Sequence, residues 1–294
     1  MSDAVVMKPT AAVLLTALRP RQWTKNVLLF AGLIFAGRLG DQAAWLNAFV
    51  AFVAYCAVSS AAYLVNDVHD VEHDRVHPTK RLRPIASGEL RRDAALVLAA
   101  ALVCIGFAFA AVLGNASVVF LVAFASLQIA YTLRLKYVQF VDVLAIAGCF
   151  TLRAGAGAAA LNVRISPWLL LCTALLATFL GLAKRRGELV LVDAARAPGR
   201  TVLSHYSRAV VDLLLVASAA AAMGAYVLYC LTGRDSNDMV VTVPFVAIGL
   251  LRYLHLVRRD DIGEEPEEVL LTDVPILLAV AGWALTAATA MSLS

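Results

Sequence analysis

Long apolar runs separated by short polar breaks make up most of this chain. Each run is long enough to cross the roughly 30 Å hydrocarbon core of a bilayer as a helix, and the alternating pattern of a membrane β-barrel is missing. The runs predict nine membrane-spanning helices, near residues 25–40, 43–65, 94–113, 116–133, 138–160, 167–184, 209–231, 240–257 and 272–292. We therefore predict an all-α integral membrane protein built as a helix bundle.

Composition supports this fold class. The 294 residues are 61% hydrophobic with a mean hydropathy of +0.79, whereas a soluble domain would be about 45–50% apolar,. We treat residues 1–294 as one transmembrane domain, with an N-terminal cytoplasmic or interfacial segment at 1–24 and long polar loops at 66–93 and 184–208. The net charge of +4 is modest, so nucleic acid is not an expected partner,.

The basic residues predict the orientation in the membrane. Of the 25 Lys and Arg residues, three lie in the loops on the side of the membrane opposite the N-terminus, and two lie inside predicted spans. The three are Arg38, Arg164 and Arg234, and the two are Arg153 and Arg252. All others lie in the N-terminal segment and in the loops on its side of the membrane. The positive-inside rule then places that side in the cytoplasm of a multi-pass cell-membrane protein.

An acidic stretch at the end of the second predicted span carries the strongest chemical signal. Asp67, Asp70 and Asp74 fall within about 60° of one helical face,. Carboxylate oxygens are the ligands that Mg2+ prefers, usually shared with substrate phosphates. These three residues are therefore the predicted metal ligands, with Asn66 beside them. The alternative is a solvated helix end whose acids only offset neighbouring bases.

A basic loop follows directly. Pro78, Pro84 and Gly88 end the helix,. Lys80 and Arg83, with Arg75 before them, could fold back over a diphosphate and stabilise the charge of a leaving group,. His69, His73 and His77 form an adjacent stripe whose spacing permits zinc, but oxygen ligands surround it and no Cys partner is present,.

Three other polar groups lie on the predicted cytoplasmic side. Arg21 and Lys25, where the first span begins, are either phosphate ligands or side chains that reach for lipid headgroups,. On the sixth span, Lys184 and Arg185 could grip phosphate while Glu188 completes a metal site, unless Lys184 and Glu188 form only a helix-surface ion pair.

The third group surrounds the start of the fifth span, with Tyr131 and Lys136 followed by Asp142 and Arg153. Charge inside a span is costly, so Asp142 and Arg153 either face a polar cavity or pair with each other.

The asparagine and aspartate pattern of 66–74 on the second of nine spans resembles the UbiA superfamily of intramembrane prenyltransferases. The finer resemblance is to its polyprenyl-phosphate (decaprenyl-phosphate) phosphoribosyltransferase branch. It rests on the segments 19–26, 66–88, 184–188 and 263–273. Val274 departs from the basic residue typical of that branch, and Lys184 to Glu188 stand where the typical prenyltransferase has a second aspartate-rich motif.

The resemblance implies a UbiA-like bundle with a cytoplasm-facing polar site and a Mg2+-dependent transfer. The 5-phosphoribosyl group of phosphoribosyl pyrophosphate would pass to polyprenyl (decaprenyl) phosphate with loss of pyrophosphate, for cell-wall arabinan precursor synthesis. The implied partners are these two substrates and the membrane, and the sequence leaves a homo-oligomer open. The alternatives are a prenyltransferase that acts on an aromatic acceptor and a transporter of a phosphorylated metabolite.

Overall fold

The computed structural model describes residues 10–193, 206–233, 237–259, 269 and 272–293. Within these residues the chain is helical and contains no strand, as predicted. The elements are α1 Ala11–Leu18, η1 Pro20–Phe30, α2 Ala31–Phe35, α3 Gln42–His69, α4 Val71–Val76, η2 Lys80–Leu82, α5 Arg92–Leu113, α6 Asn115–Leu133, η3 Leu135–Tyr137, α7 Val141–Ala160, α8 Pro167–Asp193, α9 Arg208–Thr232, η5 Asp238–Thr242, α10 Val243–Arg259 and α12 Val274–Leu293.

Eight of the described helices are long and apolar enough to cross a membrane, and they match the second to ninth predicted spans within a few residues at most ends. The largest difference is at α8, which continues through Asp193 instead of ending near residue 184. Lys184 and Glu188 therefore lie on a helix and not in a loop. The protein is a multi-pass membrane protein.

The predicted first span has an unexpected form. It was predicted at 25–40, but the helical segment begins five residues earlier and ends at Phe35. It consists of the 3-10 helix η1 followed by the short helix α2. Eleven residues at about 2.0 Å each and five at about 1.5 Å each extend roughly 30 Å, so this segment is also long enough to span the bilayer. The number of nine spans stays a prediction.

Helices α3 and α7 form the centre of the bundle, because both are far more buried than the other spans. Every residue from Arg153 to Ala160 on α7 is buried, and the last seven are Ala or Gly. Small residues let helices approach closely inside a membrane. At Gly157 a side chain would place its Cβ 2.3 Å from the carbonyl oxygen of Leu29 on η1, so only glycine fits there.

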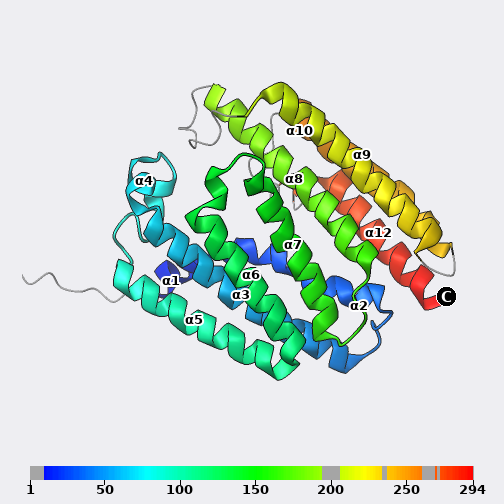
Figure 1. Ribbon diagram of the computed structural model, residues 1–294, viewed down its shortest axis with the longest axis horizontal. Coiled ribbons are helices and arrows are strands. Elements are labelled where there is room, and N and C mark those ends of the chain that lie inside the picture. The colour runs from blue at the N-terminus through cyan, green and yellow to red at the C-terminus, as the bar shows by residue number, and fades with distance from the viewer. Residues whose placement is uncertain (1–9, 194–205, 234–236, 260–268, 270–271, 294) are drawn as a thin grey trace, which may run out of the picture.

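Apolar side chains cover the outside of the bundle and fill several clusters within it, of which two are the largest. One cluster lies between α3, α5, α6 and α7, and the other lies between α8, α9, α10 and α12. In Figure 1, α3 runs between α2 and α4, which lie at opposite ends of the bundle. The segments that carry the predicted site residues are α4, the start of α7 and the end of α8, and they lie at the same end of the bundle (Figure 1).

Candidate active site

The acidic residues at the end of α3 keep a helical arrangement into α4. The amide of Asp70 donates to the carbonyl of Asn66, and the amide of Asp74 donates to the carbonyl of Asp70, both at 2.9 Å. The hydrogen bonds of the helix type therefore continue across the junction, although the backbone of Asp70 itself leaves helical dihedral angles between α3 and α4. Beyond Val76 the chain leaves the helix and passes through η2, where proline and glycine were predicted to break it.

Asp67 and Asp74 converge on one point. Arg83 Nη1 lies 3.2 Å from Asp67 Oδ1 and 2.6 Å from Asp74 Oδ2. Both carboxylate side chains are about 5% exposed. A second guanidinium reaches Asp67, since Arg19 Nη2 lies 2.5 Å from Oδ1 and 2.7 Å from Oδ2. The buried carboxylate pair is thus held by two arginines that come from distant parts of the chain.

Asp70 turns to a different base. Lys136 Nζ on η3 lies 2.8 Å from both oxygens of Asp70 and 3.2 Å from Oδ1 of Asn66, and its side chain is nearly buried. Partial burial alone would raise the pKa of the Asp70 carboxyl, but hydrogen bonds from Lys136 and His69 outweigh it and lower that pKa,. Asp70 is therefore ionised at neutral pH.

A second polar cluster joins the start of α7 to α8. Arg185 Nε lies 2.7 Å from Asp142 Oδ2, a distance that makes an ion pair although the angle is not that of a hydrogen bond. Neither side chain has any exposed surface. Glu188 forms a second ion pair with Arg185. Tyr206 donates from its hydroxyl to Asp142 Oδ1 at 2.6 Å.

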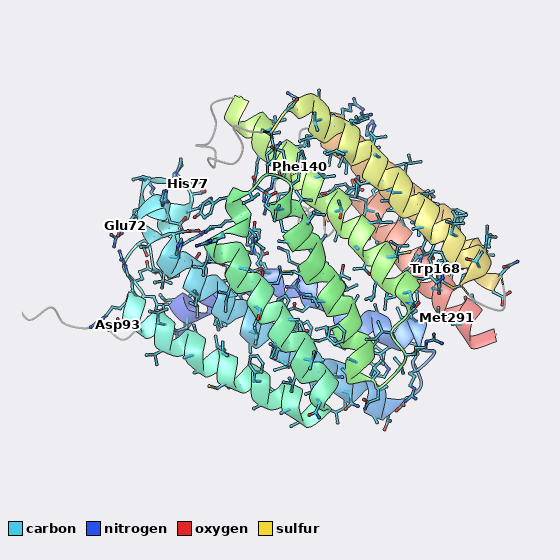
Figure 2. All side chains as sticks on the ribbon, viewed as in Figure 1. Glu72, His77, Asp93, Phe140, Trp168 and Met291 are labelled. Atoms are coloured by element: carbon cyan, nitrogen blue, oxygen red, sulfur yellow. The ribbon has the colours of Figure 1, made fainter. Side chains whose placement is uncertain are left out.

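The two clusters meet through the α6–α7 connection. Tyr131, near the end of α6, lies in the neighbourhood of Arg185. Five residues later, Lys136 binds Asp70. Phe140 directly precedes α7, and its amide donates to the Tyr206 hydroxyl at 2.7 Å. Figure 2 shows Glu72, His77 and Phe140 toward one end of the molecule and Trp168 and Met291 toward the other.

The suggested pairing of Asp142 with Arg153 is wrong. Both lie on α7, eleven residues apart, which separates them by about 16 Å along the helix axis. Arg153 instead donates from Nε to Asn26 Oδ1 on η1 at 2.7 Å, and its guanidinium lies 4.5 Å from the centre of the Phe124 ring. Asp142 has Arg185 as its partner, so its link to any substrate runs through that guanidinium.

The other residues predicted for the site lie on η1, α4, η2 and α8. Arg21 is exposed, Lys25 Nζ binds the side-chain oxygen of Gln22, and Arg75 pairs with Glu72 at 3.1 Å. Lys80 begins η2 and Lys184 lies on α8, and both are partly buried. The predicted histidine stripe does not assemble a zinc site: in the described part of the chain, no three His, Cys, Asp or Glu residues are arranged to hold a metal.

Comparison with known proteins assigns the fold and the sequence to one family. Residues 27–272 match the UbiA prenyltransferase family. The chain belongs to this family. A relative from Corynebacterium glutamicum named decaprenyl-phosphate phosphoribosyltransferase is 35% identical over 94% of this chain and 86% of the relative. A relative of the same name from Mycobacterium tuberculosis is 34% identical over 99% of both chains.

The solved structures agree with the UbiA fold. A structure of a UbiA homolog from Archaeoglobus fulgidus bound to GPP and Mg2+ has a TM-score of 0.74, covering 95% of this chain and 99% of that one. The sequence identity is 17%, so the likeness concerns the fold. It confirms the predicted UbiA-like bundle.

A divalent cation fits the carboxylate pair of this UbiA-family protein. Asp67 Oδ1 and Asp74 Oδ2 already share one cationic atom, Arg83 Nη1, and both offer the hard oxygen ligands that Mg2+ prefers,. Asp70 faces Lys136 in this arrangement and would have to turn to join them. Two carboxylate oxygens thus meet at one position, which Arg83 occupies in this structure.

Sequence reasoning missed Arg19 and Tyr206 as members of the site. Arg19 begins the segment 19–26 on which the family resemblance rests, but the residue it binds lies 48 positions away. A cue was available in Pro20, because the residue before a proline avoids the α-helical conformation. Arg19 takes a left-handed conformation with φ of 53°, which separates α1 from η1. Nothing in the local sequence marks Tyr206.

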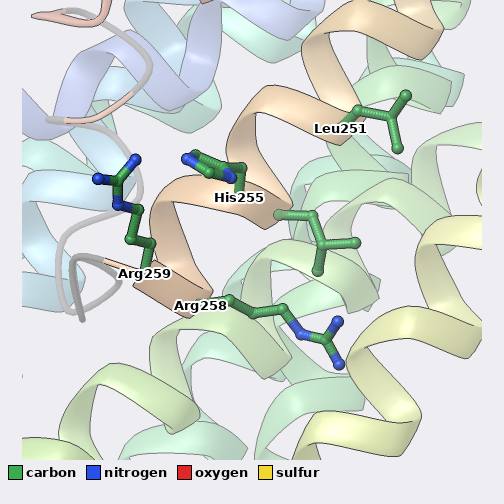
Figure 3. A pocket seen from close by; sticks show the side chains of 5 residues that line it. Leu251, His255, Arg258 and Arg259 are labelled. Atoms are coloured by element: carbon green, nitrogen blue, oxygen red, sulfur yellow. The ribbon is translucent and has the colours of Figure 1, made fainter.

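A surface hollow of about 480 Å3 lies elsewhere, on the outer side of α10 (Figure 3). It is lined by Leu251, Leu254, His255, Arg258 and Arg259. It lacks carboxylates, and its lining residues belong to neither polar cluster. We therefore place the candidate active site at the two clusters and not at this hollow.

Proposed function

We propose that this protein transfers the 5-phosphoribosyl group of phosphoribosyl pyrophosphate to the phosphate of a polyprenyl lipid such as decaprenyl phosphate, and releases pyrophosphate. The observation that carries the proposal is that Asp67 and Asp74 both bind the same cationic atom of Arg83, with Arg19 also bound to Asp67. This pair lies at the end of the bundle that carries α4. The names of the relatives supply the identity of the substrates.

In this proposal Asp67 and Asp74, joined by Asp70 and Asn66, hold Mg2+ against the diphosphate of the donor. The metal would neutralise part of the charge that develops on the departing pyrophosphate. Arg83 and Lys80 bind the same diphosphate from the η2 loop, where their charge lowers the barrier to its departure. Arg75, on α4 just before the η2 loop, and Arg21 and Lys25, on η1 just after Arg19, would guide phosphate groups toward the site.

The reaction itself needs little further chemistry. An oxygen of the lipid phosphate attacks C1 of the ribose, and the bond from C1 to the pyrophosphate oxygen breaks with its electron pair. The lipid phosphate is already ionised at neutral pH, so the step needs no general base. Lys136, Lys184 and Arg185 would orient phosphate groups, with Glu188, Tyr131 and Asp142 holding Arg185 in place.

The second candidate is a prenyl transfer from an isoprenoid diphosphate to an aromatic acceptor. It is favoured by the family description and by the GPP-bound structure of the Archaeoglobus fulgidus homolog. Against it stands the sequence at residues 184–188, which is Lys-Arg-Arg-Gly-Glu where the typical prenyltransferase has a second aspartate-rich motif. In this structure Arg185 pairs with Asp142 and Glu188, and Arg186 pairs with Asp212, so it is the missing aspartates that disfavour this candidate.

A direct assay separates these candidates. Purified protein receives Mg2+, decaprenyl phosphate and phosphoribosyl pyrophosphate labelled in the ribose, and label is measured in the organic phase. We expect labelled lipid in amounts equal to the pyrophosphate released. Turnover of geranyl diphosphate with an aromatic acid, without labelled lipid, would establish the second candidate. Uptake of label into vesicles without chemical change would indicate a transporter.

We also propose that the site faces the cytoplasm of the cell membrane. The basic residues Arg83, Arg91, Arg134 and Lys136 all lie at the end of the bundle that holds the carboxylates. The positive-inside rule assigns such an end to the cytoplasm, where phosphoribosyl pyrophosphate would be available.

A further inference from the structure

Arg19 is the one guanidinium at the carboxylate pair that the proposed reaction has not yet used. It lies between α1 and η1 in a left-handed backbone conformation, which costs on the order of 1 kcal/mol for a residue with a side chain,. This conformation directs its side chain onto Asp67, with the ring of Tyr63 5.1 Å from its guanidinium carbon. The chain therefore holds Arg19 at this carboxylate at a conformational cost.

The charges of the cluster balance. Asp67, Asp70 and Asp74 supply three negative charges, and Arg19, Arg83 and Lys136 supply three positive ones within ion-pair distance. Asp67 alone contacts two guanidinium groups. Its side chain is 5% exposed, so salt and water screen these pairs less than they would screen pairs on the surface,.

A divalent cation that approaches Asp67 has to displace a guanidinium. The incoming ion gains the carboxylate but meets positive charge already in place, so its binding alone is weak. A diphosphate changes this balance. Guanidinium groups bind phosphate oxygens in a fork-shaped, two-point geometry, so a displaced arginine finds a new partner as soon as the diphosphate arrives.

We propose that Arg19 exchanges partners during donor binding: it is the counter-ion of Asp67 until Mg2+ and a diphosphate arrive together, and it then binds the diphosphate. This inference rests on the proposed function, because it takes the donor to be a Mg2+-bound diphosphate. It adds Arg19 to the donor-binding residues. It also requires that Mg2+ and diphosphate strengthen each other's binding, since coupling between two ligands is reciprocal.

The test measures binding and not turnover. Full-length protein in nanodiscs of neutral lipid is titrated calorimetrically with Mg2+ alone, and then with inorganic pyrophosphate at zero and at saturating Mg2+. In Arg19→Gln, Mg2+ alone should bind at least about fivefold more tightly than in the unchanged protein, the low end of usual coupling strengths. The gain in pyrophosphate affinity caused by Mg2+ should fall by a similar factor.

Two variants serve as controls. Arg19→Lys keeps the positive charge and should bind Mg2+ nearly as the unchanged protein does. Arg91→Gln removes the same charge from an exposed arginine that pairs with Asp93, at the same end of the bundle, and should alter neither affinity. Elution volume and thermal midpoint establish that each variant is folded.

Mg2+ affinity that is unchanged or weaker in folded Arg19→Gln would overturn the exchange. If that variant does not fold, Arg19→Met removes the same charge with an unbranched side chain and provides the same test, and unchanged Mg2+ affinity there would be equally decisive. Failure of the proposed function gives a different pattern, because the unchanged protein would then show no labelled decaprenyl lipid in the transfer assay. If labelled lipid forms but Mg2+ affinity is the same with and without Arg19, the proposed exchange is wrong and the proposed function stands.

Discussion

Asp67 is the residue on which the two guanidinium groups of the site meet. Its carboxylate is nearly buried, and Arg83 bridges from it to Asp74. Such a residue has two roles, as an ion-pair partner and as a metal ligand. Asparagine keeps the shape of the side chain and one of its oxygens but removes the charge. A loss of activity in Asp67→Asn would therefore come from the missing charge and not from altered packing.

We predict that Asp67→Asn lowers phosphoribosyl transfer by about 100- to 1000-fold, the usual cost of losing one group that stabilises developing charge. The rate of labelled lipid formation at saturating Mg2+ measures it. Asp93→Asn, which changes an exposed aspartate paired with Arg91, is the matched control and should keep the normal rate. A normal rate in Asp67→Asn would remove that residue from the metal site.

Asp142 has a different role, because it has no exposed surface and neutralises the buried Arg185. We predict that Asp142→Asn lowers the free energy of unfolding by about 3 kcal/mol, the low end of the cost of breaking a buried ion pair, since Arg185 would keep only Glu188 as its partner,. Denaturant titration in micelles measures the loss. Asp93→Asn should leave the unfolding midpoint in place. A stable Asp142→Asn variant would mean that Tyr206 and Glu188 suffice to hold Arg185.

At the scale of elements, the 3-10 form of η1 determines which side chains reach the site. Three residues per turn align Trp23, Asn26 and Leu29 in one row. Trp23 donates to Ser60 at 3.0 Å, Asn26 accepts from Arg153, and Leu29 lies against Gly157. These contacts fix η1 against α3 and α7, and so fix Arg19 at its start.

We predict that Gly157→Ala displaces η1 and lowers the free energy of unfolding by about 1–3 kcal/mol, because its methyl group would meet the backbone of Leu29,. The control is Gly224→Ala on α9, where a Cβ meets nothing within 4 Å. That change should be neutral or slightly stabilising, since alanine favours helix. Denaturant titration of both variants makes the comparison, and equal effects would contradict the close approach at Gly157.

The sequence predicted the spans well and the contacts between them poorly, for a physical reason. Apolar runs must be long enough to cross the bilayer, so their positions are visible in any window of about twenty residues. The close approach of η1 to α7 depends on Gly157, which lies more than a hundred positions away from Leu29. The acidic cluster was predictable because it lies within one helical segment. The partners Arg19 and Tyr206 were not, because 48 and 64 residues separate them from Asp67 and Asp142.

For the whole molecule, the site and most basic residues share one end of the bundle, which we propose faces the cytoplasm. We predict that a membrane-impermeant maleimide added to intact cells labels Arg38→Cys and leaves Arg91→Cys unlabelled. Both arginines are exposed and they lie at opposite ends of the bundle. The unchanged protein is the control, since its five cysteines lie within membrane-spanning helices. The reverse labelling pattern would invert the orientation.

The central claim is that Asp67 and Asp74 jointly hold the divalent cation that binds the donor diphosphate. Anomalous diffraction from crystals grown with Mn2+ and phosphoribosyl pyrophosphate tests it most directly, because Mn2+ takes the same oxygen ligands and is visible by its own scattering. We predict an anomalous peak within coordination distance of both carboxylates, with Arg19 and Arg83 moved onto the diphosphate. A peak elsewhere, with both guanidinium groups still on the carboxylates, would contradict the claim.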